Sequence, residues 1–178
     1  MIIAETERLI ISKFSLEDAP FLLKLINTPK YLKYIGDKNL KTVEDAENYL
    51  TNGALKSYKE HGFGFYKLQE KLSNTTIGTC GLVKRDELED IDMGFAFLPE
   101  FEGQGFGFES SMAIIKLAKE KFHLKQLLAI TLPINKNSIK LLEKLGFKYQ
   151  KTVIPFDDNE ELLLFAKQLD KKQTYDNL

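Results

Sequence analysis

The sequence contains very little of what metal centres, disulfide frameworks and membrane spans require. It has one cysteine, Cys80, and two histidines, His61 and His123, among 178 residues. A single cysteine excludes an internal disulfide, and two histidines would leave a metal centre dependent on carboxylates, so no metal is expected. The longest apolar run, residues 162–166, has five residues. A membrane-spanning helix needs roughly 18.

Net charge is also small, because 25 basic and 26 acidic residues leave only −1. This balance argues against a nucleic-acid partner, which a strongly basic surface would attract. The first residues include Glu5 and Glu7 and show no basic region before an apolar core, so no signal peptide is predicted. We expect one cytoplasmic domain over residues 1–170, with no membrane partner. Residues 171–178 are predicted to form a disordered polar tail.

The residue patterns predict an α+β domain. Ser15 and Thr42 each precede an aspartate by three positions, which is typical of a helix start. Asn135 or Asn137 is expected to cap a later helix that Gly146 ends. Helical spacing of apolar residues favours helices over residues 15–28, 31–35, 42–59 and 106–122. Short segments rich in β-branched and aromatic residues predict seven strands, over residues 8–14, 63–69, 76–84, 90–98, 126–131, 147–154 and 161–168. Short connections favour a mixed, mostly antiparallel sheet.

Three glycines, Gly103, Gly105 and Gly107, stand at alternate positions where the helix predicted over residues 106–122 begins. Such a loop lets backbone amides approach a ligand, and the helix N-terminus adds about half a positive charge, so the segment suits a phosphate. A flexible turn is the alternative interpretation. A P-loop is excluded because Phe108 and Glu109 follow the last glycine in place of lysine and serine or threonine. The dinucleotide fingerprint is excluded because its third glycine belongs one position later.

The segment Glu102-Gly103-Gln104-Gly105-Phe106-Gly107 instead resembles the coenzyme A loop of the GNAT superfamily of N-acetyltransferases, whose pattern is Gln/Arg-x-x-Gly-x-Gly/Ala. Other segments, in order, are similar to the ribosomal-protein N-acetyltransferase branch: Thr6-Glu7-Arg8-Leu9, Met93-Gly94-Phe95, Asn135-Lys136-Asn137-Ser138 and Leu142 to Phe147. The resemblance implies a single domain with helices on both faces of the sheet and with its fourth and fifth strands splayed apart. It also implies an acyltransferase that moves acetyl from acetyl-CoA to a primary amine by direct attack in a ternary complex.

The resemblance implies roles for particular residues. The pyrophosphate of acetyl-CoA is expected on the backbone of Gly103, Gln104, Gly105, Phe106 and Gly107. The pantetheine arm is expected to pair with the backbone of Ala96, Phe97 and Leu98, with Asn135 and Ser138 near the arm and the thioester. For catalysis, the Phe97 amide is the expected oxyanion donor, Asp92 the expected base, and Ser138 or a water the expected acid. Alternatively, Asp92 belongs to a solvated acidic turn that begins at Asp86.

Two residues depart from the family pattern. Leu142 stands where many relatives carry a tyrosine acid, and Glu102 places a carboxylate beside the expected pyrophosphate, which is repulsive unless it points to water. Both favour the alternative function, a non-catalytic acyl-CoA sensor or assembly module. Some other nucleotide-dependent enzyme is a third possibility, but the expected phosphate-binding lysine and hydroxyl are missing. The acceptor, a small molecule or a protein N-terminus, stays open, as does a homodimer, which many relatives form.

The remaining candidates have simpler explanations. His61 is expected in a surface turn, His123 at a helix end where a cation suits the dipole, and Cys80 in the core. Tyr31 and Tyr34 fall where similar proteins place the wall of the acceptor site, although aromatic residues on a short helix usually serve packing.

Overall fold

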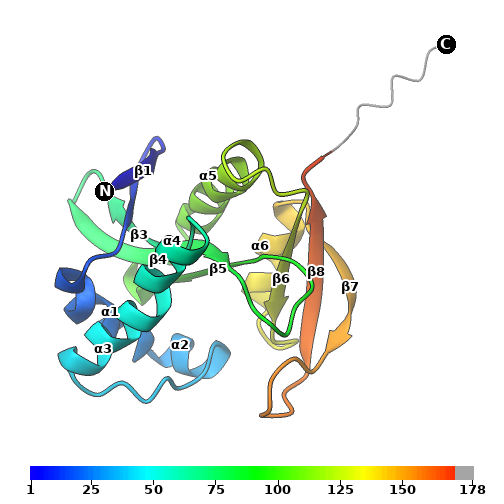
Figure 1. The fold of residues 1–178 in the computed structure, drawn as a ribbon, viewed down its shortest axis with the longest axis horizontal. Helices are drawn as coiled ribbons and strands as arrows, with labels where there is room; N and C mark the ends of the chain where they lie inside the picture. The colour runs from blue at the N-terminus through cyan, green and yellow to red at the C-terminus, as the bar shows by residue number, and fades with distance from the viewer. Residues whose placement is uncertain (171–178) are drawn as a thin grey trace.

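Eight strands form one sheet in the order β1-β2-β3-β4-β5-β6-β8-β7 (Figure 1). The computed structural model describes residues 1–170, so the predicted tail over residues 171–178 lies outside the described residues. Every neighbouring pair is antiparallel except β5 with β6. The strands are β1 (Ile2–Glu5), β2 (Leu9–Lys13), β3 (Phe65–Glu70), β4 (Thr75–Val83), β5 (Asp92–Phe97), β6 (Gln126–Thr131), β7 (Lys148–Val153) and β8 (Leu162–Gln168).

Helices cover both faces of this sheet. Adjacent residues of β3 point to opposite faces, and Phe65 packs with α1 and α3 while Tyr66 packs in the core shared with α5 and α6. Figure 1 shows α1, α3 and α4 together beside one half of the sheet. The helices are α1 (Ala19–Ile26), α2 (Pro29–Tyr34), α3 (Val43–Leu50), α4 (Lys56–Glu60), α5 (Phe106–Glu120) and α6 (Lys136–Lys144). The expected α+β domain is thus confirmed.

The helix starts predicted at Ser15 and Thr42 lead into different structures. Thr42 begins α3 with a reciprocal pair of hydrogen bonds, in which its hydroxyl accepts from the Asp45 amide at 3.1 Å and the Asp45 carboxylate accepts from its amide at 2.8 Å. Ser15 starts only a short 3-10 turn, Leu16–Asp18, before α1. The single helix predicted over residues 42–59 is divided by a π-helical turn, Thr51–Leu55, between α3 and α4.

The eighth strand, β1, was not among the seven predicted. It has four residues, lies at the edge of the sheet and pairs only with β2, with an irregularity between Ile2 and Ala4. So short a segment shows too little alternation to indicate a strand.

The strands β5 and β6 touch at one end and then separate, as expected for the splayed pair. Their only register pair joins Asp92 to Leu128, where the Leu128 amide donates to the Ile91 carbonyl at 2.9 Å. The remainder of β5 therefore presents one backbone edge to a gap in the sheet instead of to a neighbouring strand.

Candidate active site

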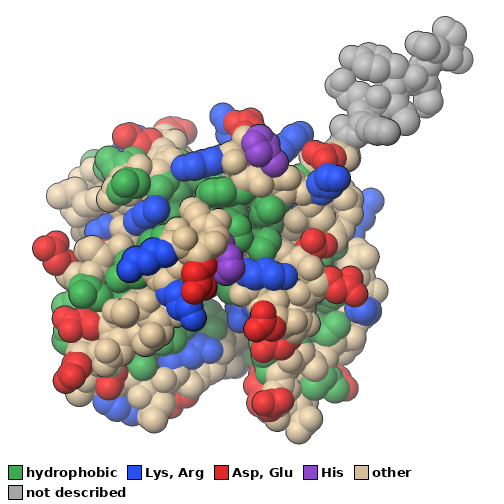
Figure 2. Space-filling model, viewed as in Figure 1, with side chains coloured by type: hydrophobic (Ala, Val, Ile, Leu, Met, Phe, Trp, Pro, Cys, Tyr) green, Lys and Arg blue, Asp and Glu red, His purple; other side chains and the backbone are tan. Residues whose placement is uncertain are grey.

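A cleft of about 1370 Å³ runs along this gap. Its walls come from β5, the glycine loop, the start of α6, the helices α2 and α3, and the connection between β7 and β8. Figure 2 shows the surface hollowed below the centre of the view, with acidic side chains along the side formed by the last strands. A pocket for one small ligand measures about 300–1,000 Å³, so this cleft has room for two substrates.

The glycine loop offers a run of unused amide donors. Gly105 is the N-cap of α5, has φ of +85° and leaves the first helical turn without a side-chain cap. Within residues 1–170, the amides of residues 103–108 donate no hydrogen bond, and the first one in this region runs from Glu109 to the Gly105 carbonyl at 3.1 Å. Free amides at the N-terminus of a 15-residue helix form a site for an anion such as a phosphate.

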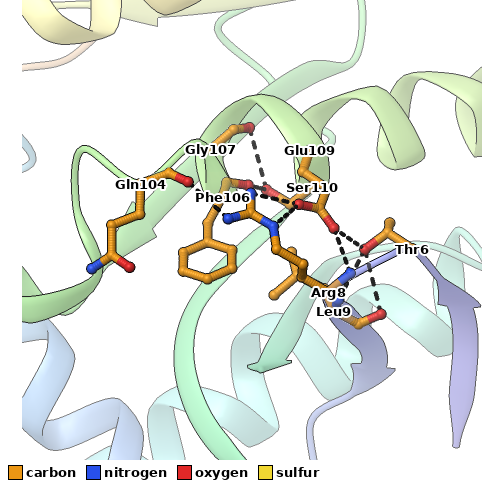
Figure 3. A network of polar contacts seen from close by, with 8 residues as sticks. All are labelled: Thr6, Arg8, Leu9, Gln104, Phe106, Gly107, Glu109 and Ser110. Atoms are coloured by element: carbon orange, nitrogen blue, oxygen red, sulfur yellow. Dashed lines mark hydrogen bonds and ion pairs between the residues drawn. The ribbon is translucent and has the colours of Figure 1, made fainter. Parts of the chain in front are cut away.

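Side chains from the turn between β1 and β2 hold this loop in place (Figure 3). Arg8 donates from Nη1 to the Gln104 carbonyl at 2.9 Å, and its guanidinium lies 4.2 Å from the centre of the Phe106 ring. Arg8 also donates from Nε to the Glu109 carboxylate at 2.7 Å, while Thr6 donates to the same carboxylate at 2.6 Å. Burial raises the pKa of Glu109, but these hydrogen bonds outweigh it and lower the pKa.

The segment from Thr6 to Leu9 carries part of the resemblance to the acetyltransferase branch, but the resemblance implies no role for Arg8. Arg8 and Glu109 are 101 positions apart, and nothing in the local pattern of either residue indicates the partner. The one available signal was that Glu109 is an acidic residue in the first turn of a helix, where a carboxylate interacts favourably with the helix dipole.

The backbone of β5 alternates between β4 and the gap. The Leu98 amide donates to the Ile77 carbonyl on β4 at 2.9 Å, and Gly78 faces Phe97 in the register. In an antiparallel ladder, the amides of Phe97 and Phe95 therefore point away from β4 and into the gap. Of the three residues expected to pair with a pantetheine arm, Phe97 thus offers its backbone to the cleft, whereas Ala96 and Leu98 direct theirs to β4.

Asp92 is buried at the closed end of the gap, with an exposed fraction of 2%. Arg85 donates from Nε to its Oδ1 at 2.9 Å. Burial raises the pKa of Asp92, and the Arg85 charge opposes that shift only in part. The alternative of a solvated turn residue does not describe this environment, because the side chain is enclosed.

The start of α6 lies on the opposite wall. Asn135 is the N-cap, and its side chain accepts from the Ser138 amide at 3.2 Å, which resolves the choice between Asn135 and Asn137. Ser138 lines the cleft and its hydroxyl has no partner within residues 1–170. Leu142 is 1% exposed and belongs to the core, so that position supplies no proton donor.

Other expected loop residues take different positions. Phe106 is buried under Arg8, and Gln104 turns its side chain back to the Glu100 carbonyl at 2.8 Å, so both reach the cleft only through their amides. Glu102 forms an ion pair with Lys30 of α2, and both side chains line the cleft. The repulsion expected between Glu102 and a pyrophosphate is therefore reduced by a neighbouring cation.

The wall nearest α2 and α3 is aromatic and basic. Tyr31, Tyr34 and Tyr49 line it together with Lys38 and Arg85. Burial raises the pKa of Tyr31 and of Tyr49 above the ordinary value. Tyr31 and Tyr34 thus line the cleft, and their place in the wall of an acceptor site stays a prediction.

The remaining candidates serve packing or follow the end of a helix, and His61 also lies on the cleft wall. Cys80 is fully buried, and burial raises its pKa to about 12. His61 is partly exposed and stacks on Phe63, and His123 follows the end of α5 with φ of +53°. No group of three or more His, Cys, Asp or Glu side chains within residues 1–170 could hold a metal ion. In the same range no helix is both long and apolar enough to cross a membrane.

Comparisons with known proteins agree with this geometry. Residues 8–148 match the family described as acetyltransferase (GNAT) domain. The chain is 25% identical over 148 residues to a Bacillus subtilis protein described as an uncharacterized N-acetyltransferase, YoaA, covering 82% of each chain.

Two solved structures share the fold at lower identity. One is a ribosomal-protein-S5-alanine acetyltransferase from Vibrio fischeri, with 18% identity, a TM-score of 0.77 and coverage of 94% of this chain and 96% of that one. The other is spermidine N-acetyltransferase from Vibrio cholerae in complex with CoA and spermine, with 13% identity, a TM-score of 0.76 and coverage of 92% and 97%.

Proposed function

Since the chain belongs to the acetyltransferase (GNAT) domain family, we propose that it transfers the acetyl group of acetyl-CoA to a primary amine. The observation that carries this proposal is the gap between β5 and β6, with the free amides of residues 103–108 on the loop that follows β5. The acceptor would be a small-molecule amine or a protein N-terminus. A similar chain bound CoA in its structure, which supports the choice of cosubstrate.

The cofactor fits the residues present. Its pyrophosphate would accept hydrogen bonds from the amides of residues 103–108, and its arm would pair with the free backbone edge of β5 at Phe95 and Phe97. Asn135 and Ser138 would flank the arm from α6. Pairing through backbone groups tolerates many side chains, which explains why Phe97 can be aromatic there.

Acetyl-CoA supplies an acetyl thioester, and in the net reaction a nitrogen–carbon bond forms, the carbon–sulfur bond breaks, and one proton moves from the amine to the sulfur. The Phe97 amide points into the gap, where it would stabilise negative charge on the acetyl oxygen. Asp92 would take the amine proton. The two residues are five positions apart, about 16 Å along a strand, so the proton would reach Asp92 through water in the cleft.

Protonation of the sulfur lacks an obvious donor, because Leu142 is apolar and buried. The Ser138 hydroxyl or a water would fill this role. This same feature supports the second candidate function, a module that binds acyl-CoA without turning it over.

Turnover separates the two functions. We would measure release of free thiol from acetyl-CoA in the presence of a panel of primary amines, with the Asp92→Asn variant as a matched control. The proposal expects amine-dependent thiol release that falls at least about a hundredfold in the variant, the lower range for a general base. Binding of acetyl-CoA without amine-dependent release would favour the non-catalytic module.

A further inference from the structure

Two of the cations that line the cleft, Arg85 and Lys38, share no ion-pair partner within residues 1–170. Arg85 follows β4, and Lys38 lies in the connection between α2 and α3; both line the cleft. Arg85 uses Nε for Asp92, and its two Nη groups have no hydrogen-bond partner within residues 1–170. The guanidinium is about one-third exposed and lies 5.6 Å from the centre of the Phe156 ring, so that one face is shielded while the outer edge stays open.

The two cations are close enough to influence one another. Partial burial and then the Arg85 charge lower the pKa of Lys38, whereas the Asp158 charge raises it. Asp92, Arg85, Lys38 and Asp158 all line the cleft. A negative group that reached both cations would give Arg85 and Lys38 a shared anionic partner.

Neutral donors line the same cleft. The hydroxyls of Tyr31 and Tyr49 feel the charge of Arg85, and burial raises the pKa of both, so they stay protonated and able to donate. Hydroxyl donors beside a guanidinium edge suit the planar oxygen pair of a carboxylate, which arginine binds through two parallel hydrogen bonds.

We propose that the amine acceptor carries a carboxylate, which binds between Arg85 and Lys38. This inference rests on the proposed acetyl transfer and names the substrate class of that site. Because Arg85 contacts Asp92 directly, a carboxylate on its free edge would bring a nearby amine of the same molecule toward the base. A polyamine offers no anion to Arg85 and Lys38, so it is the disfavoured class.

The test uses acceptors that differ in one charge. Thiol release from acetyl-CoA would be measured with the standard amino acids and with their C-terminal amides, which keep the amine and the side chain but lose the carboxylate. We expect kcat/KM for the best amino acid to exceed that for its amide at least tenfold. Equal rates for acid and amide would overturn the inference and leave the acetyl transfer standing.

Variants of Lys38 test whether this cation causes the preference for the acid over the amide. In Lys38→Met the preference for the acid should shrink to less than about threefold, mainly through a higher KM, and Lys38→Glu should favour the amide. Lys41→Met is the control, because Lys41 is exposed and does not line the cleft. Calorimetry with acetyl-CoA checks that each variant is folded. An equal loss for acid and amide in Lys38→Met would contradict the proposal.

If acetyl-CoA binds but neither series nor any plain amine releases thiol, the transfer itself is contradicted, and the inference with it. Acetylation of spermidine at a rate above that of every amino acid would contradict the inference alone.

Discussion

At the scale of single residues, the ion pair between Glu102 and Lys30 decides how the cofactor loop meets a pyrophosphate. The sequence alone showed the Glu102 carboxylate beside the expected pyrophosphate. It did not show that Lys30, which lies on α2, pairs with this carboxylate. With the pair in view, Lys30 is a cation held beside the loop, and Glu102 partly neutralises it.

We therefore expect Glu102→Gln to leave the Kd for acetyl-CoA equal or up to about fivefold lower, since an exposed pair contributes about 0–1 kcal/mol. Lys30→Met should raise the Kd, because it leaves Glu102 unpaired beside the phosphates. Isothermal titration of both variants measures this. A clearly higher Kd for Glu102→Gln would mean that its carboxylate makes a useful contact.

Asp92 gives a prediction in pH. A base acts only when deprotonated, so kcat/KM should rise with pH through the pKa of Asp92, which burial raises above its ordinary value of 3.8. The Arg85 charge lowers that pKa, so Arg85→Gln should move the rise to higher pH.

The profile of kcat/KM against pH for the wild type and both Arg85→Gln and Asp92→Asn tests this assignment. Asp92→Asn should lose the rise altogether. A profile unchanged in Asp92→Asn would show that another group takes the proton.

At the scale of elements, the contact between the β1–β2 turn and the start of α5 fixes the loop. Arg8→Met removes the bond to the Gln104 carbonyl and the partner of Glu109, each charge-assisted, so we expect the Kd for acetyl-CoA to rise about tenfold, corresponding to about 1–2 kcal/mol. The melting temperature should fall as well.

Lys116→Met is the matched control, because Lys116 forms an exposed pair with Glu120 on the same helix at 4.0 Å. It should change neither quantity measurably. Equal effects in the two variants would show that Arg8 does not position the loop.

Elements also show where sequence reasoning succeeds. The glycines before α5 and the capping residues Thr42 and Asn135 act within a few positions, so local patterns predicted the loop and the helix starts. Strand β1 was not predicted because its four residues show too little alternation. The Arg8–Glu109 pair joins segments far apart in the sequence, which local patterns do not report. The enclosure of Asp92 and the direction of the Leu98 amide likewise became visible only in the assembled sheet.

At the scale of the whole molecule, the cleft lies between the two halves of the sheet, because β5 and β6 share a single register pair. A ligand in this gap would tie them together. At a hundred times its Kd, acetyl-CoA should stabilise the fold by about 2.7 kcal/mol. For a domain of this size that raises the melting temperature by about 5–10 °C. A thermal shift assay tests this, and no shift at that concentration would contradict it.

The most direct test of the account is calorimetric titration of the protein with acetyl-CoA, using ATP and NAD as controls. We predict micromolar binding of acetyl-CoA alone, abolished in Gly105→Val, because a side chain at φ of +85° strains the loop and meets Arg8 at 3.3 Å. No binding of acetyl-CoA, or equal binding by ATP and NAD, would contradict the assignment of the cleft.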